Sequence, residues 1–207
     1  MYINTLTRDP PHNFTYILVI KDQFSGFVEL IPCDSPNSDN AASALSWWIA
    51  RFSKPEYIIS DNGTHFTSKV VEHLSRLYNV SHHFTVPYCP WSNGSVERAN
   101  RDIKALLKVI LKEAKLPEYN WPFILPAVMN VINQTPSERL GGLAPKQVYL
   151  GIDAYNPFHV LFAPSLKVGY IRLDSAKIKS HTKQLQQTLD ALHQKVTYSR
   201  TCRQQLQ

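Results

Sequence analysis

The chain has 207 residues, of which 43% are hydrophobic and 18% are charged, and these proportions are typical of an ordinary globular domain. They exclude a disordered tail protein and a collagen-like repeat, and the length suffices for a buried core without disulfides or structural metal. The formal net charge of +6 favours polyanionic partners only weakly.

The cysteines and the chain start exclude further classes. Cys33, Cys89 and Cys202 are widely separated, so they form neither a disulfide framework nor a CxxC zinc site, and their pattern favours a reducing intracellular setting. The start of the sequence lacks the pattern of an export signal, and no run reaches the roughly 18 apolar residues that a membrane-spanning helix needs. We therefore expect neither export nor a membrane partner.

The first half of the chain predicts alternating strands and helices. β-Branched and aromatic runs on both sides of a Ser-Gly turn predict a hairpin over residues 15–31. Apolar spacing predicts amphipathic helices over 41–52 and 68–78, and short apolar runs predict strands over 56–60 and 82–86. The order of these elements indicates an α/β domain.

The second half predicts mainly helices. A polar loop over 87–95 (PYCPWSNGS) precedes a long helix that we expect to begin near Ser95 and to end before Pro117. Further helices are predicted over 121–134 and 145–150. The pattern places the compact domain at 1–165 and a linker with a polar helix at 166–207, where a narrow apolar seam suits either docking on the same domain, which we favour, or a coiled coil. The seam consists of Ile178, Leu185, Leu189, Leu192 and Val196.

The excess of basic residues is concentrated in two places. Residues 174–207 hold six Lys and Arg against two Asp, which is most of the net charge. In the long helix, Glu97, Arg101, Lys104 and Lys108 recur at steps of four, three and four, which places them on one face, away from the apolar residues. Such a face either contacts phosphates or is simply a solvated face.

Two carboxylates stand out by their positions. Asp61 ends a predicted strand in IISDNGTHF, and Glu97 follows after 35 intervening residues at the start of the long helix. Each has an ordinary structural explanation, because Asp-Asn-Gly is a turn signal and an acid near a helix N-terminus is favoured by the macrodipole. Together they can converge on hard divalent cations, which activate a water or 3′-hydroxyl against a phosphodiester.

These segments resemble a known family. The catalytic core of retroviral and long-terminal-repeat retrotransposon integrases, the D,D(35)E group, is similar to four segments of the chain: the hairpin ILVIKDQFSGFVEL, YIISDNGTHFTS, HHFTVPYCPWSNGSVERANRDIK and the trailing PSERLGGLAPKQVYLG. Within this group the segments most resemble the Ty3/gypsy type. The resemblance runs from about residue 14 to 151. It implies a ribonuclease H-like fold, a mixed sheet flanked by helices, followed by a long C-terminal connector helix.

The resemblance assigns roles to matching residues. Asp61 and Glu97 match the second and third catalytic, metal-binding carboxylates, which implies Mg²⁺ or Mn²⁺ as cofactor. Asn100, Arg101, Lys104 and Lys108 lie on the helix that contacts DNA in the family. The loop at 87–95 resembles the family's mobile active-site loop, in which Tyr88 or Trp91 either stacks on a base or anchors the loop. His65, His82 and His83 lack zinc-site spacing, and we expect them to be surface or strand residues.

The first acid of the family pattern is not visible. If MYIN is aligned to the first strand, Asn4 occupies the acid's place, and a neutral amide is a poorer ligand for a cation pair; alternatively the acid precedes the first residue given. Asp22 falls at the hairpin turn, a non-catalytic position in the family, and Asp9 is a weak candidate. The expected metal is therefore poorly bound, and the chain is expected to be a truncated or decayed copy with little activity.

The resulting prediction is an integrase catalytic core that binds DNA for 3′-end processing and strand transfer by metal-dependent transesterification. The alternative is a non-catalytic DNA-binding or oligomerising protein derived from an integrase. A related nuclease or transposase is disfavoured by the SDNGTHF and NGSVERAN motifs. The expected partners are element and target DNA and further copies of the chain, with no small-molecule substrate, and the expected location is the nucleus.

Overall fold

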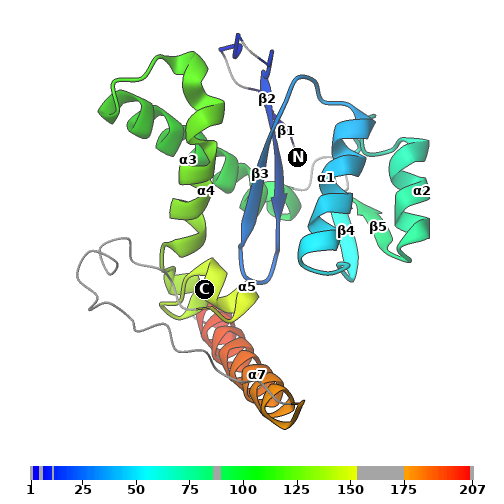
Figure 1. The fold of residues 1–207 in the computed structure, drawn as a ribbon, viewed down its shortest axis with the longest axis vertical. Coiled ribbons are helices and arrows are strands. Elements are labelled where there is room, and N and C mark those ends of the chain that lie inside the picture. Colours follow the sequence, from blue (N-terminus) through cyan, green and yellow to red (C-terminus); the bar gives the residue numbers. More distant parts are fainter. Residues whose placement is uncertain (1, 5–6, 11, 86–89, 153–174, 206–207) are drawn as a thin grey trace. The chain divides into compact units, whose positions relative to one another are not determined.

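The computed structural model describes residues 2–4, 7–10, 12–85, 90–152 and 175–205 (Figure 1). The chain divides into two compact units, one formed by Met1–Lys21 with Val28–Met129 and the other by Asp22–Phe27 with Asn130–Gln207. The domain boundary predicted near residue 165 falls within 153–174, outside the described residues. The division at 165 therefore stays a prediction.

The strands of the first unit form an antiparallel and a parallel pairing. β1 (Tyr2–Asn4), β2 (Tyr16–Lys21) and β3 (Val28–Cys33) make a three-stranded antiparallel sheet in that order, so the predicted hairpin is confirmed. β4 (Tyr57–Ser60) and β5 (Ser81–Phe84) pair in parallel. Within the part of the chain that the structure describes, these are two separate sheets.

Two helices follow the hairpin in the first unit. α1 (Ser38–Arg51) begins at Asn37, whose side chain accepts a hydrogen bond from the Asn40 backbone N–H at 2.8 Å, as expected of an N-cap. α2 (Lys69–Leu77) is capped in the same way by Ser68. Both helices were predicted from their apolar spacing, and both are confirmed.

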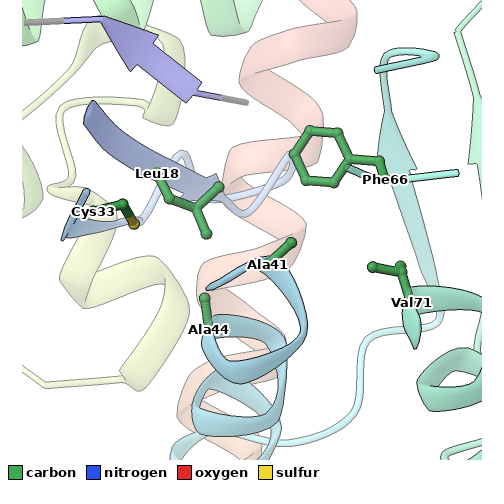
Figure 2. Packing of buried hydrophobic residues seen from close by; sticks show 6 residues of the cluster. All are labelled: Leu18, Cys33, Ala41, Ala44, Phe66 and Val71. Carbon is green, nitrogen blue, oxygen red and sulfur yellow. The ribbon is translucent and has the colours of Figure 1, made fainter. Parts of the chain in front are cut away.

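A buried cluster joins the antiparallel sheet to α1 and to the chain around α2. Figure 2 shows side chains of β2 and β3 facing α1, with an aromatic ring and a valine from residues 66–71 beside them. Burial raises the pKa of the Cys33 thiol to about 11, so this cysteine is an inert core residue. The cluster consists of Leu18, Cys33, Ala41, Ala44, Phe66 and Val71.

The long helix is longer than the sequence predicts. α3 spans Pro90–Glu113, so the expectation of a loop up to Ser95 is wrong for residues 90–95. Proline is favoured at the first helical position because its φ is already helical, and Gly94 costs only about 1 kcal/mol inside a helix. A 3₁₀ turn, η1 (Glu118–Asn120), and α4 (Trp121–Gln134) follow, and α4 has the predicted bounds.

The second unit gathers the C-terminal helix, a short helix and the hairpin turn. It contains η2 (Glu138–Leu140), α5 (Pro145–Leu150) and α7 (Ser175–Gln205). Leu140, Val148 and Val196 form its buried cluster, and the Arg200 guanidinium lies 4.6 Å from the centre of the Phe24 ring.

The predicted seam on the C-terminal helix is thus confirmed at Val196 as a docking surface within the same chain. Leu189 and Leu192 are half-buried, while the side chains of Ile178 and Leu185 lie outside the described residues. None of the helices described is both long and apolar enough to cross a membrane.

Candidate active site

Asp61 comes directly after β4, as the sequence predicts, and its side chain is half-buried. Its Oδ1 accepts a hydrogen bond from the Gly63 backbone N–H at 3.2 Å. The backbone then turns, and Phe66 donates its N–H to the Gly63 carbonyl at 2.9 Å. Because the Phe66 ring belongs to the buried cluster, this turn fixes Asp61 relative to the core.

A polar pair supports the strand end from the neighbouring strand. The Ser60 Oγ lies 2.8 Å from His82 Nε2 and donates to the Asp61 carbonyl at 3.0 Å. A hydroxyl has a single proton, so the arrangement that satisfies both contacts has the His82 N–H donating to Ser60. Sequence reasoning treated His82 as a strand or surface residue, and only the parallel pairing of β4 with β5 reveals its contact.

The surroundings of two histidines near Asp61 disfavour their protonated forms. Burial, and then the neighbouring His83, lower the pKa of His82. Burial also lowers the pKa of His65, and the negative charge of Asp61 opposes that effect. The His65 ring packs against the Phe66 ring with centroids 4.3 Å apart. Both imidazoles therefore favour the neutral form, which is the form that accepts a proton or ligates a metal.

Glu97 lies on the second turn of α3 and is exposed. Elsewhere on this helix Ile103, Leu107 and Leu111 are 0%, 6% and 7% exposed. The predicted burial of apolar residues and exposure of charged residues along this helix is therefore confirmed for the described side chains.

The candidate DNA-binding residues occupy that charged face. Arg101, Lys104 and Lys108 are exposed, and Asn100 is half-buried. Steps of three and four residues bring Glu97, Arg101, Lys104 and Lys108 to one side of the helix. An acid among long cations on one face offers ligands for a metal and donors for phosphates, and a solvated face remains the alternative.

Among the predicted first-acid positions, Asn4 is the last residue of β1, in register with Tyr16. Asp22 has a structural role, since its Oδ2 accepts from both the N–H and the Oγ of Ser25 at 2.6 Å. Asp9 is 6% exposed and contacts the His12 ring at 2.9 Å. Within the described ranges, no three His, Cys, Asp or Glu side chains gather as metal ligands.

Two further candidates fall outside what is described. Tyr88 belongs to the residues that the structure leaves undescribed, and Trp91 is helical but its side chain is not described. Their stacking or anchoring roles stay predictions. The metal and DNA roles of Asp61, Glu97, Asn100, Arg101, Lys104 and Lys108 stay predictions as well.

Comparison with known proteins supplies the family. Residues 5–90 match the family model described as "Integrase core domain". The chain is 33% identical over 162 residues to the Pro-Pol polyprotein of simian foamy virus type 1, and 36% identical over 137 residues to the Gag-Pol polyprotein of walleye dermal sarcoma virus. Residues 5–90 therefore resemble an integrase core domain, and the chain is similar to retroviral Pol polyproteins. The Ty3/gypsy type within this family stays a prediction.

These alignments cover most of this chain but little of the viral polyproteins. They include 76% and 66% of the chain, but the chain spans only 13% and 8% of the two polyproteins. The activities and partners of the whole polyproteins can therefore only be proposed for this chain, not inferred from these alignments.

Solved structures support the predicted fold. The HTLV-2 integrase catalytic core domain in complex with magnesium matches with a TM-score of 0.57 and 25% identity over 72% of this chain and 90% of that one. The BIV integrase catalytic core domain matches with a TM-score of 0.58 and 24% identity over 73% and 91% of the two chains. The predicted α/β ribonuclease H-like fold is confirmed.

Proposed function

We propose that this integrase core binds DNA and belongs to the machinery of DNA integration, in which 3′-end processing is followed by strand transfer. The observation that carries the proposal is α3, where Glu97 shares an exposed face with Arg101 and Lys104 while Ile103 and Leu107, on another side of the helix, are buried. Lys and Arg contacts to phosphate are independent of base sequence, which suits an enzyme that joins DNA ends into many targets.

We propose that Asp61 and Glu97 hold Mg²⁺ or Mn²⁺. The donor types fit, because carboxylate oxygens are the ligands that these hard cations prefer. Asp61 keeps acceptor capacity, since a carboxylate offers about four lone-pair sites and the Gly63 N–H uses one of them. The magnesium complex of the HTLV-2 core domain supports the same cofactor here.

In the proposed reaction the chain positions groups and forms no covalent intermediate. The cations, when bound, activate a water or DNA 3′-hydroxyl and stabilise the leaving oxygen. The attacking oxygen forms a bond to phosphorus as the bond to the leaving 3′ oxygen breaks. Asn100, Arg101, Lys104 and Lys108 would hold the phosphates beside Glu97.

We further propose that the chain as given transfers strands poorly. Asn4 ends β1, the strand on which the family pattern expects the first acid, and an amide supplies a neutral oxygen in place of a shared anion. The same observation at Asn4 favours a second candidate function, a DNA-binding or oligomerising protein that does not catalyse strand transfer.

A strand-transfer assay with Mn²⁺ and short DNA ends tests both candidates. We expect little product from the unmodified chain and more product from Asn4→Asp, with Glu97→Gln abolishing that gain. Turnover by the unmodified chain that Glu97→Gln abolishes would contradict the proposed weak activity. Failure of the chain to bind DNA at low salt would overturn the proposed function, and failure to self-associate as well would overturn the second candidate.

We also propose that the chain forms homo-oligomers and acts in the nucleus. The HTLV-2 core domain is described in trimeric and dimeric forms, which supports self-association. Light scattering of the purified chain tests its oligomeric state. The location of a fluorescently tagged copy in cells tests the second point.

A further inference from the structure

Asp61 and His65 lie on the same side of Gly63, where a glycine leaves space for both. A β-carbon added to Gly63 would lie 2.8 Å from His65 Nε2 and 3.1 Å from Asp61 Oδ1. The two atoms are thus at most about 6 Å apart, and an ion about 2.1 Å from each ligand needs them within roughly 4 Å, a separation that rotation of the imidazole toward Asp61 would have to provide.

We propose that His65 joins Asp61 as a second protein ligand of one divalent ion, making a mixed oxygen and nitrogen site that favours transition metals over Mg²⁺. The inference deepens the proposed function, since it rests on Asp61 being a metal ligand there. It adds an imidazole to a site for which sequence reasoning assigned only carboxylates.

The chemistry of the two donors sets the preference. Mg²⁺ prefers oxygen ligands and strict octahedral geometry, whereas imidazole nitrogen suits the later first-row ions. A site with one carboxylate and one imidazole therefore strengthens Co²⁺, Ni²⁺ or Zn²⁺ binding while leaving Mg²⁺ binding to the carboxylate. Mn²⁺, which tolerates both donor types, falls between these extremes.

The local packing keeps both donors near the site. The His65 ring contacts Phe66, whose side chain is 7% exposed, while Asp61 follows β4 and accepts from the Gly63 N–H. His65 lies in a short turn that is hydrogen-bonded to Gly63 through Phe66 and Thr67. The alternative is that His65 only packs on Phe66, and then its replacement does not change metal affinity.

Metal titration of the full chain by calorimetry, with Co²⁺ and Mg²⁺ as separate probes, tests the proposal. His65→Asn is expected to weaken Co²⁺ binding by at least about tenfold and to leave Mg²⁺ binding within about twofold. Visible absorption of bound Co²⁺ should change in the same variant, because the d–d bands depend on the ligands. The control is His73→Asn, which removes an exposed histidine from α2.

Gly63→Ala is a second variant that keeps both proposed ligands. The added methyl would lie 2.6 Å from His65 Cε1, so the ring must move away, whereas Asp61 needs to shift by only a few tenths of an ångström. We expect a loss of Co²⁺ affinity similar to that of His65→Asn. A thermal melt of each variant establishes that it is folded.

The outcomes separate this proposal from the proposed function. If Asp61→Asn weakens both metals and His65→Asn weakens neither, the carboxylate site stands and the imidazole ligand is refuted. If Asp61→Asn leaves both metals unaffected, the carboxylate site itself is refuted. Equal losses of Co²⁺ affinity in His65→Asn and His73→Asn would show binding to surface histidines and would overturn the proposal.

Discussion

The two candidate carboxylates lie in contrasting surroundings. Asp61 is half-buried at the end of β4, where Ser60 donates to its carbonyl and the Gly63 N–H donates to its carboxylate. Glu97 is exposed on α3 and is positioned by helical periodicity, with Ile103 buried on another side of the helix. Substitutions around Asp61 should therefore mainly lower the free energy of unfolding. Substitutions beside Glu97 should mainly change the affinity of the surface for DNA.

The largest effect is expected from Phe66→Ala. This ring is 7% exposed, belongs to the buried cluster and supports the turn that follows Asp61. Truncation of a buried phenylalanine costs about 3–5 kcal/mol, because transfer energy is lost and a cavity remains. Denaturant unfolding should show this loss, while Phe123→Ala, at an 82% exposed position, should cost less than about 0.5 kcal/mol. Equal losses of unfolding free energy in the two variants would show that the Phe66 ring does not hold the turn after Asp61.

A smaller loss is expected from Ser60→Ala. The variant removes the hydroxyl that contacts His82 Nε2 and the Asp61 carbonyl. A hydrogen bond of this kind contributes about 1 kcal/mol, and the half-buried imidazole loses its contact with Ser60. The matched control is Ser81→Ala, on the adjacent strand at an exposed position. Identical unfolding midpoints for the two variants would show that the pair adds nothing to the strand end.

Sequence reasoning and structure agree where periodicity determines the element. The charged face of α3 follows from steps of three and four residues, and the Val196 docking position follows from a heptad-like seam. Asp61 is recognised because a turn motif follows an apolar strand. The contact between Ser60 and His82 joins residues 22 positions apart and depends on which strands pair, which a single sequence does not reveal.

The start of α3 shows a different kind of failure. Pro90 and Gly94 read locally as loop residues, but proline is accepted in the first helical turn and one glycine can be offset by the rest of a long helix. The approach of His65 to Asp61 was missed because it depends on the turn around Gly63 and not on the spacing of histidines.

The histidines near Asp61 make the stability of the fold depend on pH. Burial lowers the pKa of both His82 and His65, so the folded state disfavours their protonation. Below the unfolded pKa of about 6.5 the unfolded chain binds more protons, and stability falls as pH drops. The melting temperature should therefore decline from about pH 7.5 to about pH 5.5, and less so in His82→Gln. A decline that is unchanged in His82→Gln but smaller in His73→Gln would contradict this origin.

The smallest effect on stability is expected on the Glu97 side. Arg101→Ala with Lys104→Ala removes two exposed cations, and exposed substitutions usually stay within about 0.5 kcal/mol. The same variant should weaken DNA binding and reduce the slope of log affinity against log salt by about two, because each lost phosphate contact removes about one released counterion. Lys69→Ala with Arg76→Ala removes two exposed cations from α2 as a charge-matched control. An equal reduction of the slope in both double variants would mean that DNA senses net charge only, and that the basic face of α3 is a solvated surface.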